Sequence, residues 1–195
     1  MTVAPGFLLD GRVRHDQPAA GFRSGIEPVL LAASIPARPG ERVLEGGAAA
    51  GAALLCLAAR VPGVVGVGVE RDSALVALAA ANARANRFGL LSFVAASIPD
   101  LPFGGGFDHA FANPPYHRAD GTRSPVAARE AAKRADAATL DVWARALGGR
   151  LRHRGTLTFV LPTGSLPEAM AAMTAAGCAP AAVFPLWPRA GQAAR

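Results

Sequence analysis

The segment FDHAFANPPYHR, residues 107–118, follows a short apolar run with an amide, two prolines and the only tyrosine of the chain. Each proline holds its own φ near about −65°, lacks an N–H group and disfavours helix in the residue before it. The corner Asn113-Pro114-Pro115-Tyr116 is therefore rigid, rich in hydrogen-bond acceptors and closed by an aromatic ring. Such a corner is either a binding site or only a stiff loop, and the residues around it must decide.

Two other segments carry residue types that suit a ligand containing ribose. Small residues fill the turn from Glu45 to Gly51, EGGAAAG, which allows a ligand to approach backbone amides at the start of a helix. Glu70 ends the next apolar run, where one carboxylate can accept hydrogen bonds from both ribose hydroxyls. Each feature alone is common, and Glu70 is equally consistent with a capping or solvated acid ahead of Asp72. Their order along the chain is more specific than any one of them.

The elements that must position these residues alternate between strand and helix. This alternation predicts an α/β fold, with a mostly parallel sheet covered by helices on both faces, preceded by a small hairpin turning at Asp10-Gly11. The expected strands are 41–45, 64–70, 91–96, 107–112, 156–162 and 181–186, and the expected helices are 28–35, 50–61, 72–86, 136–147 and 166–177. Ligands of such sheets bind outside the carboxyl ends of the strands. The ends of the first, second and fourth strands should therefore share one crevice.

The composition suits one soluble domain. Hydrophobic residues make up 51% of the 195 residues, yet no apolar run reaches the length of a membrane span and the N-terminus lacks a signal-peptide pattern. Cys56 and Cys178 have no metal-ligand spacing, so we expect two inert thiols in a reducing cytoplasm. Neither a metal site nor membrane association is expected.

The formal charge of +6 comes almost entirely from arginine. A basic domain suits a partner that presents phosphate, although solvated surface charge is the more common explanation for any one cluster. The two clusters are Arg12, Arg14, His15 and Arg23 near the start, and Arg150, Arg152, His153 and Arg154 before the fifth expected strand.

In combination, RVLEGGAAAG (42–51), Glu70 and FANPPY (111–116) resemble the class I S-adenosylmethionine-dependent methyltransferases, and among them the NPPY-bearing group that methylates exocyclic or amide nitrogens. The upstream segment QPAAGFRSGIEPVLLAAS (17–34) makes the chain similar to the tRNA(Val) adenine N6-methyltransferases. The resemblance implies a single Rossmann-like methyltransferase domain, with a hairpin and helix before residue 36. It also implies S-adenosylmethionine as cofactor, RNA, and in particular tRNA, as partner, and a cytoplasmic location.

The resemblance assigns a role to individual residues. The Asn113 side-chain oxygen and the Pro114 carbonyl would hold the two N–H groups of the acceptor, and Tyr116 would stack on its plane, which makes these three the expected catalytic residues. The expected cofactor-binding residues are Glu45, Gly47, Ala49, Gly51, Glu70, Arg71, Ser97 and Asn113. The expected substrate-binding residues are Arg23, Tyr116, Arg118 and Arg123. In the acceptor-side loop expected over 117–135, Lys133 and Arg134 either bind phosphate or only keep the loop soluble.

Some positions depart from the family pattern. Ala49 occupies the place of the central glycine, where a methyl group would interfere if the residue needs a positive φ. Ser97 stands where the family commonly has an acid that reads the adenine of the cofactor. A seventh strand expected between the fifth and sixth is missing, and a strand-exchanged homodimer is one way to fill the gap.

Two alternatives to an RNA adenine N6-methyltransferase stay open. One is a protein glutamine N5-methyltransferase, because the NPPY corner also suits an amide nitrogen. The other is an inactive relative that binds RNA or a protein partner, because the cofactor turn is altered. A dinucleotide-dependent dehydrogenase lacks support, since the G-x-G-x-x-G spacing is absent.

Overall fold

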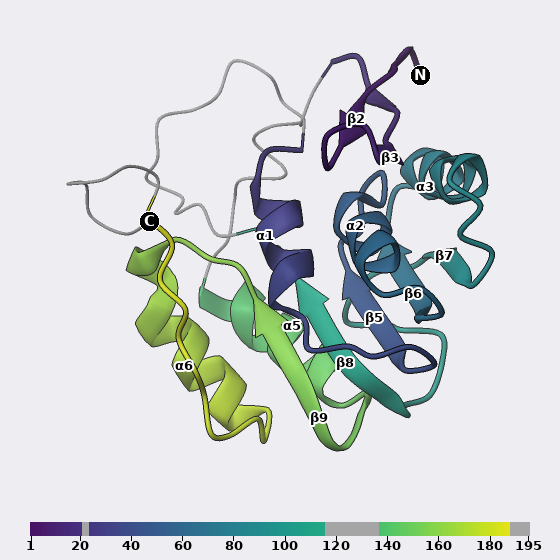
Figure 1. The fold of residues 1–195 in the computed structure, drawn as a ribbon. Helices are drawn as coiled ribbons and strands as arrows, with labels where there is room; N and C mark the ends of the chain where they lie inside the picture. The colour runs from purple at the N-terminus through teal and green to yellow at the C-terminus, as the bar shows by residue number, and fades with distance from the viewer. Residues whose placement is uncertain (21–23, 116–136, 188–195) are drawn as a thin grey trace.

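The computed structural model describes residues 1–20, 24–115 and 137–187. Its centre is a five-stranded parallel sheet in the order β7-β6-β5-β8-β9 (Figure 1). The strands are β5 (Arg42–Gly46), β6 (Val65–Glu70), β7 (Leu91–Ala95), β8 (Phe107–Ala112) and β9 (Leu151–Phe159). Because β5 lies between β6 and β8, the carboxyl ends of these three strands meet at one edge, which confirms the predicted crevice side.

The central strands β5 and β8 are largely buried, as expected of a parallel sheet covered on both faces, whereas β7 and β9 at the two sides are half-buried or exposed. All six residues of β8 are buried. In β6, Gly66 and Gly68 make room for side chains of β7: a Cβ added to them would lie 2.7 Å from Leu91 and 2.5 Å from Phe93. The alternating glycines of β6 are therefore a packing requirement of the sheet.

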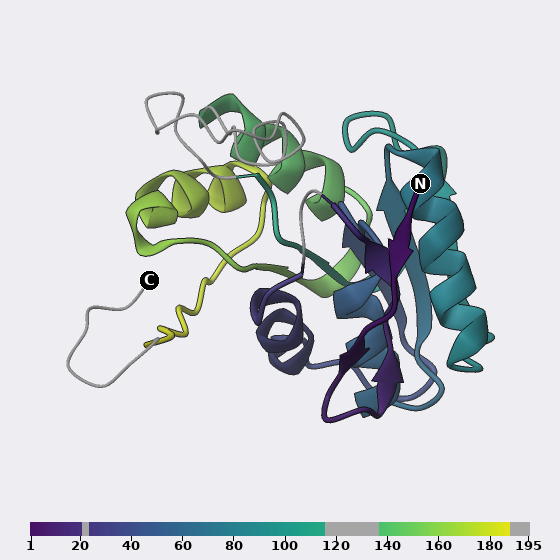
Figure 2. The ribbon, with the colours of Figure 1, turned by 90° about the horizontal axis from the view of Figure 1, so that it is seen from above.

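Helices cover both faces of the sheet. The helices α1 (Glu27–Ser34), α2 (Ala52–Arg60) and α3 (Ser73–Ala85) precede the fourth strand of the sheet in the chain, and α5 (Ala137–Gly148) and α6 (Leu166–Ala175) follow it. Figure 2 shows α1 on one side of the sheet and α5 with α6 on the other. Phe111 packs with the α1 and α2 side, whereas Leu44 packs with Leu147 of α5. The predicted helices are confirmed to within a few residues.

The predicted N-terminal hairpin is confirmed and is longer than predicted. The strand β2 (Phe7–Leu8) pairs with β3 (Val13–Arg14), and Asp10 and Gly11 have φ of 53° and 84° in the turn. A second antiparallel pair, β1 (Val3–Ala4) with β4 (Gln17–Pro18), was not predicted, because two-residue strands leave no periodicity to detect.

The predicted sixth strand is wrong. Residues 181–186 form no strand, and Phe184 is 81% exposed. Pro180 and Pro185 lack the N–H groups that a ladder needs, and these residues have no pairing with any described strand. The apolar composition of the segment therefore misled the prediction.

The fifth strand of the sheet begins earlier than predicted. Phe107 of β8 pairs with Leu151 and His109 pairs with Thr156, so β9 is bulged between these partners. Arg154 has a φ of 62° in the bulge. The second basic cluster thus lies at the amino-terminal edge of the sheet, opposite the predicted crevice, where Arg152 is 2.6 Å from the Asp108 carboxylate.

Two further expectations concern the cysteines and the membrane. Cys56 and Cys178 are both free thiols. Burial raises the thiol pKa of Cys56 to about 12 and also raises the pKa of Cys178. Across residues 1–20, 24–115 and 137–187, no helix is both long and apolar enough to span a membrane.

Candidate active site

The turn after β5 needs glycine at both of its outer positions. Gly47 and Gly51 have φ of 66° and 89°, in the left-handed region that side chains rarely adopt. A Cβ on Gly47 would lie 2.7 Å from the Trp143 indole, and one on Gly51 would lie 3.1 Å from the Phe93 ring. Both positions therefore require glycine for backbone conformation and for space.

The central position of the same turn holds alanine in a conformation that favours glycine. Ala49 has a φ of 47°, which confirms that this position requires a positive φ. An L-residue pays about 1–2 kcal/mol there. The backbone N–H of Ala49 donates to Glu70 Oε2 at 3.0 Å, so the strained residue is held by a charged acceptor.

Glu70 connects the first two strand ends. Its Oε2 accepts from Ala49, and its Oε1 accepts from the N–H of Asp72 at 3.0 Å. Asp72 is the cap of α3, because its side chain accepts from the N–H of Ala74 at 2.8 Å. Each carboxylate oxygen has more than one acceptor position, so Glu70 orders the turn and retains capacity to accept hydroxyl donors.

Glu45 lies beneath the turn and is only 5% exposed. Its Oε2 accepts from the N–H of Leu54 at 3.1 Å, which fixes the start of α2. Burial raises the pKa of Glu45 to about 8, and the nearby Glu70 carboxylate acts in the same direction, against the hydrogen bond from Leu54. The observed role of Glu45 is to anchor α2, and its contact with cofactor stays a prediction.

Asn113 emerges at the same edge from β8. Ala112 pairs with Gly46 of β5, which puts Asn113 beside the first residue of the turn, Gly47. The Asn113 Oδ1 atom is buried and has no hydrogen-bond partner among the described residues. A buried acceptor without a donor costs about 1–3 kcal/mol. Among the described residues, the Asn113 oxygen therefore keeps an unfilled acceptor position, and its contact with a ligand stays a prediction.

Two of the other predicted cofactor-binding residues also lie at this edge. Arg71 directly follows Glu70 and is exposed. The N–H of Ala96 donates to the carbonyl of Glu70 at 3.0 Å, so the exposed Ser97 comes next to the second strand end. The structure thus brings the predicted cofactor residues from β5, β6, β7 and β8 to one edge.

Pro114 directly follows Asn113 and is buried, and its role stays a prediction; the remaining predicted site residues lie outside the described residues. These are Arg23, Tyr116, Arg118 and Arg123, together with Lys133 and Arg134. Their roles in acceptor or phosphate binding stay predictions. Within the described parts of the chain, no group of three or more histidine, cysteine, aspartate or glutamate side chains has a metal-binding arrangement.

Sequence reasoning missed two residues that shape the site. Asn82 of α3 is 1% exposed, and its Nδ2 donates to the carbonyl of Ala50 in the turn at 3.0 Å. Asparagine disfavours helix interiors, so its presence there was an available signal. Trp143 of α5 lies against Gly47, a contact between distant segments that no local pattern indicates.

A family model and a known relative both match this chain. The family model of the methyltransferase small domain matches residues 27–141. A tRNA1(Val) (adenine(37)-N6)-methyltransferase of Actinobacillus succinogenes is 32% identical over 167 residues, which cover 83% of this chain and 70% of the relative. This chain belongs to the methyltransferase small domain family. It is accordingly an S-adenosylmethionine-dependent methyltransferase with a Rossmann-like fold.

Solved structures support the fold of this methyltransferase small domain. TrmN from Thermus thermophilus has a TM-score of 0.57 at 22% identity, over 75% of this chain and 40% of that protein. The geranyl diphosphate C-methyltransferase of Streptomyces coelicolor, solved with S-adenosyl-L-homocysteine, has a TM-score of 0.51 at 14% identity, over 76% and 50%. The chain spans half or less of these two proteins, and likenesses at such identities show the fold alone.

The residues present fit S-adenosylmethionine. The positive φ values of Gly47, Ala49 and Gly51 keep the turn open to a close approach, and Glu70 retains acceptor capacity for ribose hydroxyls. The Asn113 oxygen at the end of β8 has no partner among the described residues, so a ligand donor would satisfy it. Ala49 and Ser97 are the two places where the fit is weaker than in the family pattern.

Proposed function

We propose that this methyltransferase transfers a methyl group to the N6 amino group of an adenine in tRNA. The observation that carries the proposal is the buried Asn113 Oδ1, which lacks a donor among the described residues and lies beside the turn after β5. The 32% identical relative named for tRNA adenine N6 methylation supports the acceptor, and the net charge of +6 supports a phosphate-bearing partner.

The chemistry required of the chain is mainly positioning. An adenine amino group is a poor nucleophile because its lone pair is delocalised into the ring. Asn113 Oδ1 and the Pro114 carbonyl accept its two N–H bonds, which aims the lone pair and stabilises the positive charge that develops on nitrogen. When bound, S-adenosylmethionine would supply the methyl group and its sulfur would keep the electron pair of the broken bond, while Asn113 and Pro114 hold the acceptor nitrogen that forms the new bond. The nitrogen then releases one proton to water, so no strong base is required.

The first experiment incubates the protein with deproteinised tRNA and cofactor carrying a labelled methyl group. We expect labelled N6-methyladenine in the RNA. Label only in protein would instead support glutamine methylation. A wild-type protein that labels neither fraction, although it binds cofactor, would contradict the proposal.

A substitution at Asn113 tests whether its side-chain oxygen takes part in methyl transfer. Asn113→Ala removes the acceptor and should lower kcat by about 10²–10³-fold, the scale of removing one stabilising hydrogen-bond group from an active site. Asn113→Asp keeps an acceptor oxygen and should retain more activity. Asn86→Ala is the matched control on α3 and should leave kcat within a few-fold of wild type, as measured by initial rates with saturating tRNA.

The second candidate function is an inactive relative that binds RNA. The specific observation in its favour is the alanine at the strained centre of the cofactor turn, Ala49. Calorimetric titration with S-adenosyl-L-homocysteine separates the two candidates, because an enzyme should bind this product in the micromolar range. An absence of binding heat, with tRNA binding intact, would favour the inactive relative.

We further propose that residues 1–195 work as one domain, located in the cytoplasm with its tRNA substrate. The hydrogen bonds between the hairpin and α3 support the first part. A homodimer is also proposed, since β9 is paired on one side only among the described strands and an unpaired edge invites association. Light scattering that returns the mass of one chain would rule out the dimer.

A further inference from the structure

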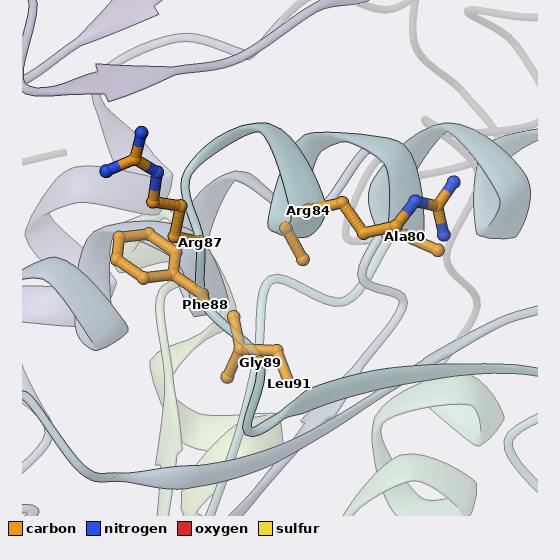
Figure 3. Close-up of a pocket in the computed structure, with 7 residues that line it drawn as sticks. Ala80, Arg84, Arg87, Phe88, Gly89 and Leu91 are labelled. Carbon is orange, nitrogen blue, oxygen red and sulfur yellow. The ribbon is translucent and has the colours of Figure 1, made fainter.

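A second site is suggested at the far end of α3, where the chain turns into β7. A pocket of about 360 Å³ lies there (Figure 3). It is lined by Ala80, Ala83, Arg84, Arg87, Phe88, Gly89 and Leu91. Two cations and an aromatic ring thus surround a hollow that the residues of the cofactor site do not line.

Arg84 and Arg87 are two exposed arginines near the end of α3. Neither forms a salt bridge with the described residues, whereas Arg14 is 2.9 Å from Asp16 and Arg145 pairs with Asp141. Arg84 lies in the last turn of α3, where a cation is favourable for the helix, but Arg87 lies beyond the helix end. Among the described residues, the two guanidinium groups therefore have no anionic partner and can bind an external anion.

The directions of the two side chains indicate the shape of that anion. Figure 3 shows the Arg84 side chain running back along α3 toward Ala80, and the Arg87 side chain pointing away from it beyond the helix end. A single small anion would not bridge two groups that diverge. Successive charges along an extended polyanion fit them, and the half-buried Phe88 lies beside Arg87, on the side away from Arg84 (Figure 3).

The backbone around this pocket is held in place. The N–H groups of Arg87 and Phe88 donate to the carbonyls of Arg84 and Ala83 at 3.0 Å each. One residue before Arg87, the Asn86 side chain exchanges two hydrogen bonds with the backbone of Arg14 in the hairpin. A cationic site on a fixed backbone loses less conformational freedom on binding.

The helix also sets the distance of this pocket from the methylation site. The α3 helix starts just after Glu70 at the cofactor edge and runs for 13 residues, or about 20 Å at about 1.5 Å per residue. A tRNA is long enough to reach both places. We propose that Arg84 and Arg87 bind the phosphodiester backbone of the RNA substrate about 20 Å from the methylated base, an inference that rests on the proposed function for its partner.

The test compares two double variants that remove the same charge. Arg84→Gln with Arg87→Gln removes the proposed contacts, and Arg145→Gln with Arg154→Gln removes two exposed arginines from α5 and the β9 bulge. The affinity for tRNA is measured by filter binding at several salt concentrations. We expect the first variant to bind about tenfold more weakly at ~0.1 M salt, with a slope of log K against log salt that is smaller by ~1.4–1.8. For the control variant, the slope of log K against log salt should differ from the wild-type slope by less than ~0.5.

Steady-state kinetics give the second readout. The first variant should raise KM for tRNA and leave kcat unchanged, because it removes contacts remote from the reacting atoms. On an RNA hairpin too short to span about 20 Å, the variant and wild type should be equally active. Circular dichroism verifies that both double variants are folded.

Equal losses of tRNA affinity in the two double variants would overturn the proposal, since they would indicate unspecific charge attraction. Unchanged affinity in the first variant would overturn it as well. If the wild-type protein methylates no RNA, the proposed function is wrong, whatever the outcome of the binding comparison. The binding comparison would still decide whether RNA uses this pocket.

Discussion

Ala49 is the residue at which the cofactor turn is most strained. Its φ of 47° is one that glycine adopts without steric cost. The hydrogen bond from its N–H to Glu70 holds the conformation in place. Alanine in place of the family's glycine therefore strains the backbone only at this position, and the outer glycines of the turn are retained.

Restoring glycine at this position should stabilise the protein. Ala49→Gly removes a left-handed strain of about 1–2 kcal/mol and loses about 0.4–1 kcal/mol through the more flexible unfolded chain, so we expect a net gain of roughly 0.5–1 kcal/mol in the free energy of unfolding. Urea titration measures it. Ala50→Gly is the control at a position without a positive φ and should destabilise by a similar amount.

The same substitution should tighten cofactor binding, because the loop no longer resists the conformation that the ligand requires. The dissociation constant for S-adenosyl-L-homocysteine, measured by calorimetry, should fall several-fold in Ala49→Gly. A weaker affinity in this variant would show that the Ala49 methyl contributes a contact that glycine cannot replace.

At the scale of elements, α3 connects three parts of the molecule. Its first residues follow Glu70 and Asp72 at the cofactor edge, and its end carries Arg84. In between, Asn82 accepts from the N–H of Asp16 at 3.0 Å and donates to the Asp16 carbonyl at 2.8 Å, besides its bond to Ala50. One buried amide thereby ties the hairpin, the helix and the cofactor turn together.

Removing this amide should destabilise the fold strongly. Asn82→Ala leaves three backbone groups without their partner, and at about 1 kcal/mol for each hydrogen bond we expect a loss of about 3 kcal/mol. Thermal melts and urea titration measure it. Asn86→Ala removes bonds nearer to solvent and should cost about 1 kcal/mol, because water can replace them. Equal losses in both variants would argue against a special role for burial at Asn82.

Across the whole molecule, polar groups gather at both ends of the parallel strands. At the amino-terminal edge, Asp108 accepts from the N–H of Arg42 at 2.7 Å and lies beside Arg152, and His109 is 3.0 Å from Glu41. At the carboxyl edge, the Asn113 oxygen is unpartnered among the described residues. Buried polar atoms without a hydrogen-bond partner among the described residues occur at both ends: Arg150 Nε before β9 at the amino end, and Asn113 Oδ1 after β8 at the carboxyl end.

Global stability should depend on pH through Glu45. Its folded pKa is about 8 against a usual 4.5, so the folded state holds a proton that the unfolded state releases between these values. This contribution to stability is complete below about pH 4.5 and is lost as pH rises to about 8, at up to about 1.4 kcal/mol per pH unit.

Glu45→Gln should remove this dependence, since glutamine keeps an acceptor for the N–H of Leu54 and cannot ionise. The free energy of unfolding of the variant, relative to wild type, should rise between about pH 4.5 and 8 and be several kcal/mol higher at the upper end. Urea titrations of the protein without cofactor, repeated across this range, measure it. A difference that does not change with pH would contradict the buried, protonated state of Glu45.

Much of the fold followed from local patterns. The apolar runs that became β5 to β8 and the helical patterns between them were predicted to within a few residues, because burial on both faces leaves a continuous apolar signal. The cap at Asp72 was also confirmed, and the central turn residue Ala49 has the positive φ under which the sequence analysis expected its methyl group to interfere. The predicted strand over 181–186 was wrong, because apolar composition does not reveal whether a pairing partner exists.

By itself, the sequence determined the order of elements and the residue types that each strand brings to the carboxyl edge. Both depend on short-range chemistry: side-chain periodicity, proline and glycine geometry, and capping. Only the tertiary structure decided that Trp143 lies against Gly47, that Asn82 ties the hairpin to the cofactor turn, and that Arg152 neutralises Asp108 while Arg84 and Arg87 stay unpaired among the described residues. These contacts join segments far apart in the chain, and the partner of a charge or an amide is set by packing in space, which no local pattern encodes.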